Sequence, residues 1–226
     1  MSGPTPAILF DLDGTLIHSA PDVCHAVNHV FEAEGMAPLT VDQVKGYLGK
    51  GARILMEQAV TDNGHRRDAE ALDRMTDDFL EFYAAHPVVH STVFPGVFDV
   101  LGSLRDRGAI LAICTNKPSV TTAPVLDALE LTPWFDTIVC GDQVTDKKPH
   151  GGHVLETIAA CGGSRNRAVM IGDSENDIDA AIHAGVPSVA VSFGYTNKPV
   201  RELGADRVID SFAELDAALA AIGFAI

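Results

Sequence analysis

The chain has 226 residues, of which 46% are hydrophobic, and its formal net charge is −15. At roughly 100–200 residues per domain, this length predicts one large domain, or one domain that carries a sizeable insertion. The acidic balance argues against nucleic acid or an anionic membrane as a partner, because both require a basic face. No apolar run approaches the roughly 20 residues that span a bilayer.

The cysteine pattern and the start of the chain indicate a reducing compartment. The four cysteines lie far apart, with no CxxC spacing, and are Cys24, Cys114, Cys140 and Cys161. This spacing is typical of buried, reduced thiols. Residues 1–6 lack the basic start, apolar stretch and cleavage site of a signal peptide. We therefore expect a cytoplasmic protein, either a monomer or a homodimer.

The first predicted strand covers residues 7–12, and about eighty residues without a convincing strand follow it. Helical patterns fill this stretch, at 21–34, 41–48, about 51–60 and 68–86. In the last of them, Leu72, Met75, Phe79 and Phe82 recur every three or four residues and form one apolar stripe. We interpret residues 17–88 as a helical cap domain, and residues 1–16 and 89–226 as the core domain.

Beyond the cap, strands and helices alternate. Short apolar runs typical of buried parallel strands occur at 109–115, 137–141, 168–172, 188–192 and, more weakly, 207–210. Helical patterns occur at 97–107, 120–129, 153–161, 175–184 and 212–222. This alternation predicts an α/β fold whose core is a Rossmann-like parallel sheet, with the helical cap inserted after the first strand.

Polar side chains follow the predicted strands, at the edge where an open α/β sheet binds its ligands. Asp11 and Asp13 end the first strand two residues apart, so both side chains point the same way. Two nearby carboxylates repel each other unless they share a cation or a proton. Gly14 permits a tight turn whose backbone N–H groups can bind an anion. Asp173 adds a third carboxylate, and hard oxygen ligands in this number favour Mg²⁺.

Other strand ends supply groups that suit a phosphate. Thr115 and Asn116 end the second strand of the core, and Lys148 lies between the third and the fourth. Lys148, Thr115 and backbone amides could neutralise the charge of a phosphoryl group. Each of these features has an ordinary structural explanation by itself, but their convergence at successive strand ends favours a site.

Four short motifs resemble those of the haloacid dehalogenase-like hydrolases. They are DLDGTL at 11–16, TNKP at 115–118, KKP at 147–149 and GDSENDIDAA at 172–181. Their order and spacing match over essentially the whole chain. Further segments resemble the phosphoglycolate phosphatase branch, among them HSAPDVCHAVN at 18–28, GKGARIL at 49–55 and FPGV at 94–97. The helical insertion resembles the small cap of that branch.

The resemblance implies catalytic roles for three residues. Asp11 would be the nucleophile that forms an aspartyl-phosphate, and Asp13 the general acid and then the general base. Lys148 would neutralise the phosphoryl group and Asp11. Phosphoryl transfer depends on positioning and charge stabilisation, which such a set can supply.

The resemblance also implies binding roles. Mg²⁺ would be held by Asp11, the backbone oxygen of Asp13, and Asp173. Asp177 and Ser174 would lie in the shell outside these ligands. Thr115 and Asn116 would bind the transferring phosphoryl group, together with the turn at Gly14.

The expected function is hydrolysis of a small phosphorylated metabolite, most plainly 2-phosphoglycolate to glycolate and phosphate. A broad sugar-phosphate phosphatase, a pyrophosphatase and a phosphomutase of the same superfamily stay open as alternatives. A dehalogenase is disfavoured, because cleaving a carbon–halogen bond needs neither an acid at position 13 nor Mg²⁺. A non-catalytic phospho-acceptor module is also disfavoured, since it has no need of a cap that encloses a substrate.

We expect the cap to recognise the part of the substrate that lies beyond its phosphate group. Lys50 and Arg53 stand in the glycine-bounded loop GKGAR at 49–53, which opens a predicted helix. A helix N-terminus favours an anion, so this loop could bind the carboxylate of 2-phosphoglycolate. The alternative interpretation makes both residues ordinary solvated side chains.

Three positions depart from the family pattern or suggest other chemistry. His18 stands where the family usually has Asp, and we expect an effect on the hinge into the cap. His150 and His153 lack a third soft ligand at a suitable spacing. We therefore expect both to be exposed residues at a helix start and not metal ligands.

Overall fold

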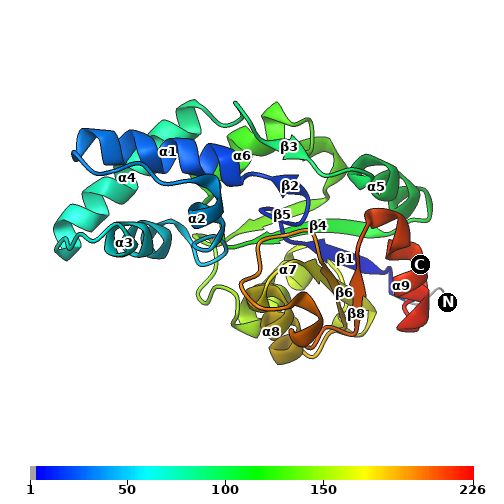
Figure 1. Cartoon of the computed structure of the whole chain (residues 1–226). Coiled ribbons are helices and arrows are strands. Elements are labelled where there is room, and N and C mark those ends of the chain that lie inside the picture. Colours follow the sequence, from blue (N-terminus) through cyan, green and yellow to red (C-terminus); the bar gives the residue numbers. More distant parts are fainter. Residues whose placement is uncertain (1–3) are drawn as a thin grey trace.

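A parallel sheet of six strands forms the core of the computed structural model, which describes residues 4–226 (Figure 1). Its order is β5-β4-β1-β6-β7-β8. The strands are β1 (Ala7–Phe10), β4 (Ile110–Thr115), β5 (Thr137–Cys140), β6 (Ala168–Gly172), β7 (Ser188–Val191) and β8 (Arg207–Ile209). The chain leaves β1 toward one edge and later crosses to the other, so β1 lies at the switch point where open sheets bind ligands. The predicted α/β fold is confirmed.

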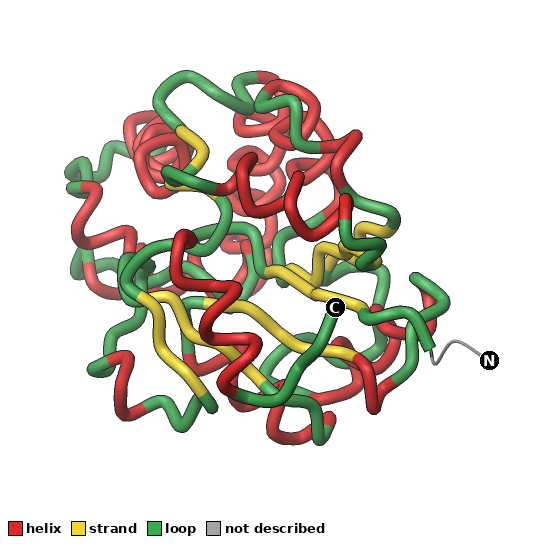
Figure 2. Tube along the Cα trace, turned by 90° about the vertical axis from the view of Figure 1, so that its right-hand side faces the viewer, coloured by secondary structure: helices red, strands yellow, loops and turns green. Residues whose placement is uncertain are grey.

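Helices cover both faces of the sheet, because its strands are apolar on both sides. On β1, Ile8 and Phe10 belong to one hydrophobic cluster, while Ala7 and Leu9 belong to another. The first cluster includes residues of α5 (Val97–Asp106), α6 (Ser119–Ala128) and α9 (Leu215–Ala221), and the second includes residues of α7 (Gly151–Ala160) and α8 (Glu175–Ala184). Figure 2 shows the strands lying between these helices.

Four helices lie beyond the sheet, on the left of Figure 1. They are α1 (Ala20–Ala33), α2 (Val41–Lys45), α3 (Ala52–Asp62) and α4 (Ala69–Ala85), and all fall within the predicted cap. On α4, Leu72, Met75 and Phe79 are buried, whereas Phe82 is partly exposed. The predicted apolar stripe is thus what packs α4 against its neighbours.

The two connections between the cap and the sheet run side by side. β2 (Ile17–His18) leads into the cap and pairs antiparallel with β3 (Thr92–Val93), which leads out of it. The buried carboxylate of Asp22 then accepts three backbone N–H groups from residues 89–91 of the returning chain. Sequence analysis missed this two-stranded sheet, because two residues are too few to show an alternating pattern.

Short helical turns complete the chain. Four 3₁₀ helices occur at η1 (Thr132–Trp134), η2 (Arg165–Arg167), η3 (Val200–Glu202) and η4 (Phe212–Glu214). The helix expected at 212–222 is therefore divided into η4 and α9. No helix in residues 4–226 is both long and apolar enough to cross a membrane. The four cysteines are free thiols, as expected, although Cys161 is only partly buried.

Candidate active site

A cavity lies between the carboxyl edge of the sheet and the cap. Its empty volume, which includes open solvent at its mouth, is about 520 Å³. The core residues that line it are Asp11, Asp13, Thr115, Asn116, Lys117, Pro118, Thr121, Lys148, Ser174, Asn176 and Asp177. The cap contributes Val23, Leu48, Gly49, Gly51, Ala52, Leu55, Phe79 and Tyr83. The structure therefore brings most of the sequence-predicted residues to one enclosed space.

Lys148 is the buried cation at the centre of the site, with 4% of its surface exposed. Its Nζ donates to Asp11 Oδ1 at 2.8 Å, to Asp177 Oδ1 at 2.6 Å and to the carbonyl oxygen of Cys114 at 2.6 Å. An ammonium group has three protons, so these bonds use them all. Burial by itself would lower the pKa of Lys148, but Asp11 and Asp177 outweigh it and raise that pKa. Lys148 is therefore charged and held in one position.

Asp173 begins the turn after β6 and lies opposite Asp11. One ligand atom each of Asp11, Asp173 and Asp177 can be chosen so that all three lie within 4.8 Å of one another. Asp177 is already committed, since its second oxygen Oδ2 accepts from Asp173 N, Ser174 N and Ser174 Oγ. Asp177 thus positions the turn and Lys148.

The space around Asp173 exists because two neighbouring residues are glycines. A Cβ on Gly14 or on Gly194 would collide with the Asp173 carboxylate. Gly14 has φ +88°, a conformation that L side chains rarely adopt. The backbone N–H of Tyr195 donates to Asp173 Oδ2 at 2.6 Å and fixes the carboxylate in this cradle.

The charges of the site indicate a cation. Burial, opposed by Lys148, raises the pKa of Asp11 to about 7. Burial and then the charges of Asp177 and Asp11 raise the pKa of Asp173 well above its usual value. If all four carboxylates (Asp11, Asp13, Asp173, Asp177) were ionised, they would exceed the positive charge of the two lysines (Lys117, Lys148) by two. A divalent cation would neutralise this excess, and an all-oxygen donor set suits a hard metal ion.

Lys117 is a residue of the site to which sequence analysis gave no role. Its Nζ lies 3.2 Å from each carboxylate oxygen of Asp13, 3.0 Å from the hydroxyl oxygen of Tyr83 and 4.2 Å from the centre of the Tyr83 ring. Although burial would lower it, Asp13 and Tyr83 raise the pKa of Lys117. Lys117 directly follows Thr115 and Asn116 at the end of β4, and that position was the available signal.

Asn116 and Gly14 occupy the site differently from what was expected. The Asn116 side chain donates to the carbonyl oxygens of Gly49 at 2.8 Å and Lys148 at 2.7 Å, and accepts from Lys148 N at 3.0 Å. Its amide therefore ties the Lys148 loop to the cap and has no proton left for a phosphate. The N–H of Gly14 donates to the carbonyl oxygen of Ile17, so it is not free either. Thr115 lines the cavity, as expected.

The structure does not bring Lys50 and Arg53 to the cavity. Lys50 is exposed, although Gly49 and Gly51 on either side of it do line the cavity. The Arg53 side chain is turned to the cap surface, where it pairs with Asp73 at 2.6 Å and Glu57 at 3.4 Å. The cation that the cap contacts at the cavity is instead Lys117 of the core, whose Nζ donates to the hydroxyl oxygen of Tyr83 on α4.

The histidines also need one correction. His150 is exposed at the start of α7, as expected, and its Nδ1 accepts from Gly152 N. His153 is fully buried, which contradicts the expectation that it is exposed. Burial and then the nearby Lys148 lower the pKa of His153 to about 4, so it packs under the site as a neutral ring. His18 lies in β2, where its Nδ1 is 2.7 Å from the Tyr195 hydroxyl oxygen.

Comparisons with known proteins agree with this geometry. The family model of the haloacid dehalogenase-like hydrolases matches residues 8–191. A phosphoglycolate phosphatase of Caulobacter vibrioides is 45% identical to this chain, and the alignment covers 92% of this chain and 88% of the relative. A phosphoglycolate phosphatase of Agrobacterium fabrum is 41% identical, and the alignment covers 95% of this chain and 92% of the relative. The crystal structure of a predicted phosphoglycolate phosphatase from Haemophilus somnus superposes with a TM-score of 0.88 at 28% identity, covering 94% of this chain and 97% of that one.

The cradle of Asp173 leads to a first prediction. Gly194→Ala should displace the Asp173 carboxylate and weaken the binding of a divalent cation by at least about tenfold. Mn²⁺ titration followed by electron paramagnetic resonance measures this affinity. Gly102→Ala is the matched control, because the nearest atom to its new Cβ would be 3.8 Å away. Unchanged Mn²⁺ affinity in Gly194→Ala would mean that Asp173 is not a ligand.

The raised pKa values of Asp11 and Asp173 lead to a second prediction. A carboxyl group whose folded pKa is raised contributes stability at low pH that is lost as the pH rises through the folded value. For Asp11 this loss occurs as the pH rises to about 7. A divalent cation competes with these protons, so Mg²⁺ should raise the thermal unfolding temperature more at pH 8 than at pH 6. An equal or larger effect at pH 6 would contradict the assignment of these carboxylates.

Proposed function

Because the chain belongs to the haloacid dehalogenase-like hydrolase family, we propose that it hydrolyses 2-phosphoglycolate to glycolate and phosphate. The observation that carries this proposal is the pair Asp11 and Asp13 in one enclosed cavity, each held by its own buried lysine. The names of the relatives support the substrate. Sugar phosphates are the alternative substrates within the same chemistry.

The first half of the reaction is transfer of the phosphoryl group to Asp11. One Asp11 carboxylate oxygen attacks phosphorus, an aspartyl-phosphate forms, and the bond to the glycolate oxygen breaks. The leaving alkoxide takes a proton from Asp13, so no free alkoxide has to form. Lys148 stays beside Asp11 and offsets the charge that gathers on the phosphoryl oxygens.

The second half returns Asp11 to its starting state. Asp13 takes a proton from a water molecule, whose oxygen attacks phosphorus and displaces Asp11. The carboxylate and inorganic phosphate are released, and Asp13 is again protonated for the next cycle. Splitting the hydrolysis in two lets one acid–base residue serve both steps from a single position.

We propose Mg²⁺ as the cation of the site. Asp11, Asp173 and the backbone oxygen of Asp13 would hold it, since these are hard oxygen donors in a region with two excess negative charges. When bound, it would polarise the phosphoryl oxygens and reduce the repulsion between them and Asp11.

Lys117 is proposed to bind the carboxylate of 2-phosphoglycolate. It is the cavity cation that is not enclosed by Asp11 and Asp177, and it contacts Asp13, whose proton goes to the substrate oxygen. Because Asp13 and Tyr83 already accept from its Nζ, the substrate carboxylate would take the place of one of these acceptors. A substrate of two carbons would place its carboxylate within reach of the same region. Tyr83 of the cap holds the Lys117 ammonium group at this position.

Turnover tests the proposed chemistry. Asp11→Asn should lower kcat for 2-phosphoglycolate by at least about a thousandfold, because the reaction loses its nucleophile. Phosphate release is measured with Mg²⁺ for 2-phosphoglycolate and for a panel of sugar phosphates. Asp179→Asn, a change on α8 outside the cavity lining, serves as the control. Retention of more than a tenth of kcat by Asp11→Asn would refute the assignment.

Ethyl phosphate is a comparison substrate that separates binding of the substrate carboxylate from acid catalysis. Its leaving group is also an alkoxide, which needs a proton, but it has no carboxylate. Lys117→Ala should lower kcat/KM for 2-phosphoglycolate about 10- to 100-fold more than for ethyl phosphate, because only 2-phosphoglycolate would lose a charge-assisted hydrogen bond. Lys50→Ala, which alters an exposed cap lysine, should affect neither. If Lys117→Ala lowers kcat/KM by the same factor for both substrates, Lys117 acts only through Asp13.

A further inference from the structure

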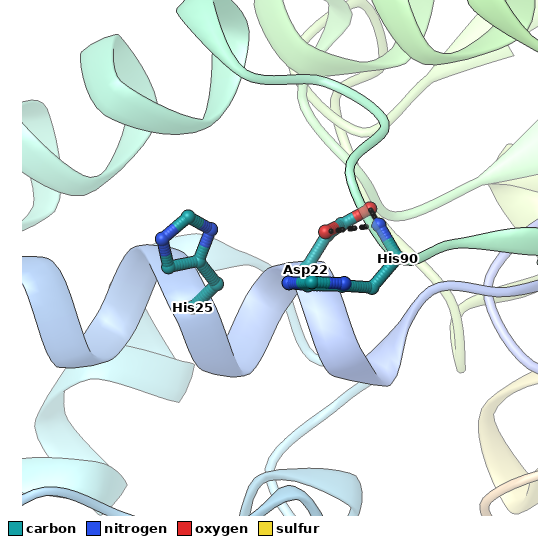
Figure 3. A group of neighbouring side chains, drawn as sticks. All are labelled: Asp22, His25 and His90. Atoms are coloured by element: carbon teal, nitrogen blue, oxygen red, sulfur yellow. Dashed lines mark hydrogen bonds between the residues drawn. The ribbon is translucent and has the colours of Figure 1, made fainter.

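A second cluster of metal-ligand side chains lies away from the cavity, where the cap joins the sheet. Asp22, His25 and His90 can each offer one ligand atom such that all three atoms lie within 4.8 Å of one another. Figure 3 shows Asp22 and His25 on α1 and His90 on the chain that returns from the cap. We propose that these three residues form a binding site for Zn²⁺ or a similar first-row divalent ion.

The position of each residue follows from the local fold. Asp22 and His25 are three residues apart on α1, so they lie on the same face of the helix. His90 is brought to them because its own backbone N–H donates to the Asp22 carboxylate at 2.9 Å. The backbone contact that closes the cap connection therefore also places the second imidazole, whose ring centre is 5.9 Å from that of His25.

Asp22 is a buried anion without a cationic partner. Only 2% of its surface is exposed, and none of the ion pairs found in residues 4–226 includes it. Burial would raise its pKa, but the donors at residues 89–91 lower it, so the group is ionised. Those donors crowd Oδ2, while Oδ1 accepts only from His90. Oδ1 thus retains a lone pair for a cation.

The other groups around Asp22 also have unused capacity. Within the described chain, no hydrogen bond is made by the ring nitrogens of His25 or His90, and both side chains are exposed. The His25 ring packs edge-on against Phe82, with 5.2 Å between the ring centres. Two neutral imidazoles and one carboxylate are a donor set for Zn²⁺ and its neighbours, whereas Mg²⁺ prefers oxygen alone. A water molecule would complete four-coordination.

Binding at this place has a structural consequence. Two ligands come from the first turns of α1 and the third from residues just before β3, so one ion would connect the two strands of chain that link cap and core. Such an ion binds the folded protein and not the unfolded chain, and should therefore raise the thermal unfolding temperature.

The test measures the binding of Zn²⁺ directly. The carboxylates of the cavity are prevented from contributing by a substitution and by excess Mg²⁺. In the Asp173→Asn background with excess Mg²⁺, calorimetric titration with ZnCl₂ should show one equivalent bound. His25→Gln and His90→Gln should each weaken this binding at least about tenfold, since each removes a ligand. His29→Gln is the matched control, because His29 is an exposed histidine one turn along α1 that stacks on Phe82 at 3.9 Å.

Thermal unfolding completes the test. In EDTA, the Gln variants should unfold at the same temperature as the parent, which shows that they fold. Addition of ZnCl₂ should raise the unfolding temperature of the parent and of His29→Gln, but not of His25→Gln or His90→Gln. Absence of a zinc equivalent in the parent, or equal zinc binding in all variants, would overturn the proposal.

Discussion

The contact of Lys148 with Asp11 and Asp177 is the interaction on which the rest of the site depends. Three carboxylates meet in a region from which water is excluded, where unpaired charge is very costly. Lys148 offsets part of that charge, and its third proton is bound by a carbonyl oxygen of β4. Asp11, the turn after β6 and the edge of the sheet are therefore fixed relative to one another by one ammonium group.

The same lysine loop also controls how the cap meets the core. The Asn116 amide binds the backbone of Lys148 with one proton and the Gly49 carbonyl of the cap with the other. Asn176 of α8 donates to that same carbonyl at 3.2 Å. Together with the contact of Tyr83 and Lys117, these bonds connect the cap to the loop at the end of β4 and to the Lys148 loop.

The positions of residues at strand ends could be predicted from the sequence, because they follow from the geometry of the backbone. The directions of individual side chains could not, because they depend on tertiary packing. The strand ends located Asp11, Asp13 and Asp173, because parallel strands present their carboxyl ends at one edge. The burial of His153 is different, since it depends on which side of the first turn of α7 packs on the sheet. Arg53 is likewise a matter of side-chain direction: it lies in the first turn of α3, where its guanidinium group pairs with Asp73 on a neighbouring helix and not with the cavity.

The proposed binding of an anion by a chain with a net charge of −15 depends on the local environment of the cavity and not on the total charge. Charges on the surface are screened by water and salt, so the many exposed acids have little effect at the cavity. An ion pair at 4 Å is worth about 1 kcal/mol in water but several times more at a lower effective dielectric constant. Lys117 is 7% exposed and lines the cavity. On the proposal made above, this buried lysine would contribute more to recognition of the substrate than an exposed residue such as Lys50.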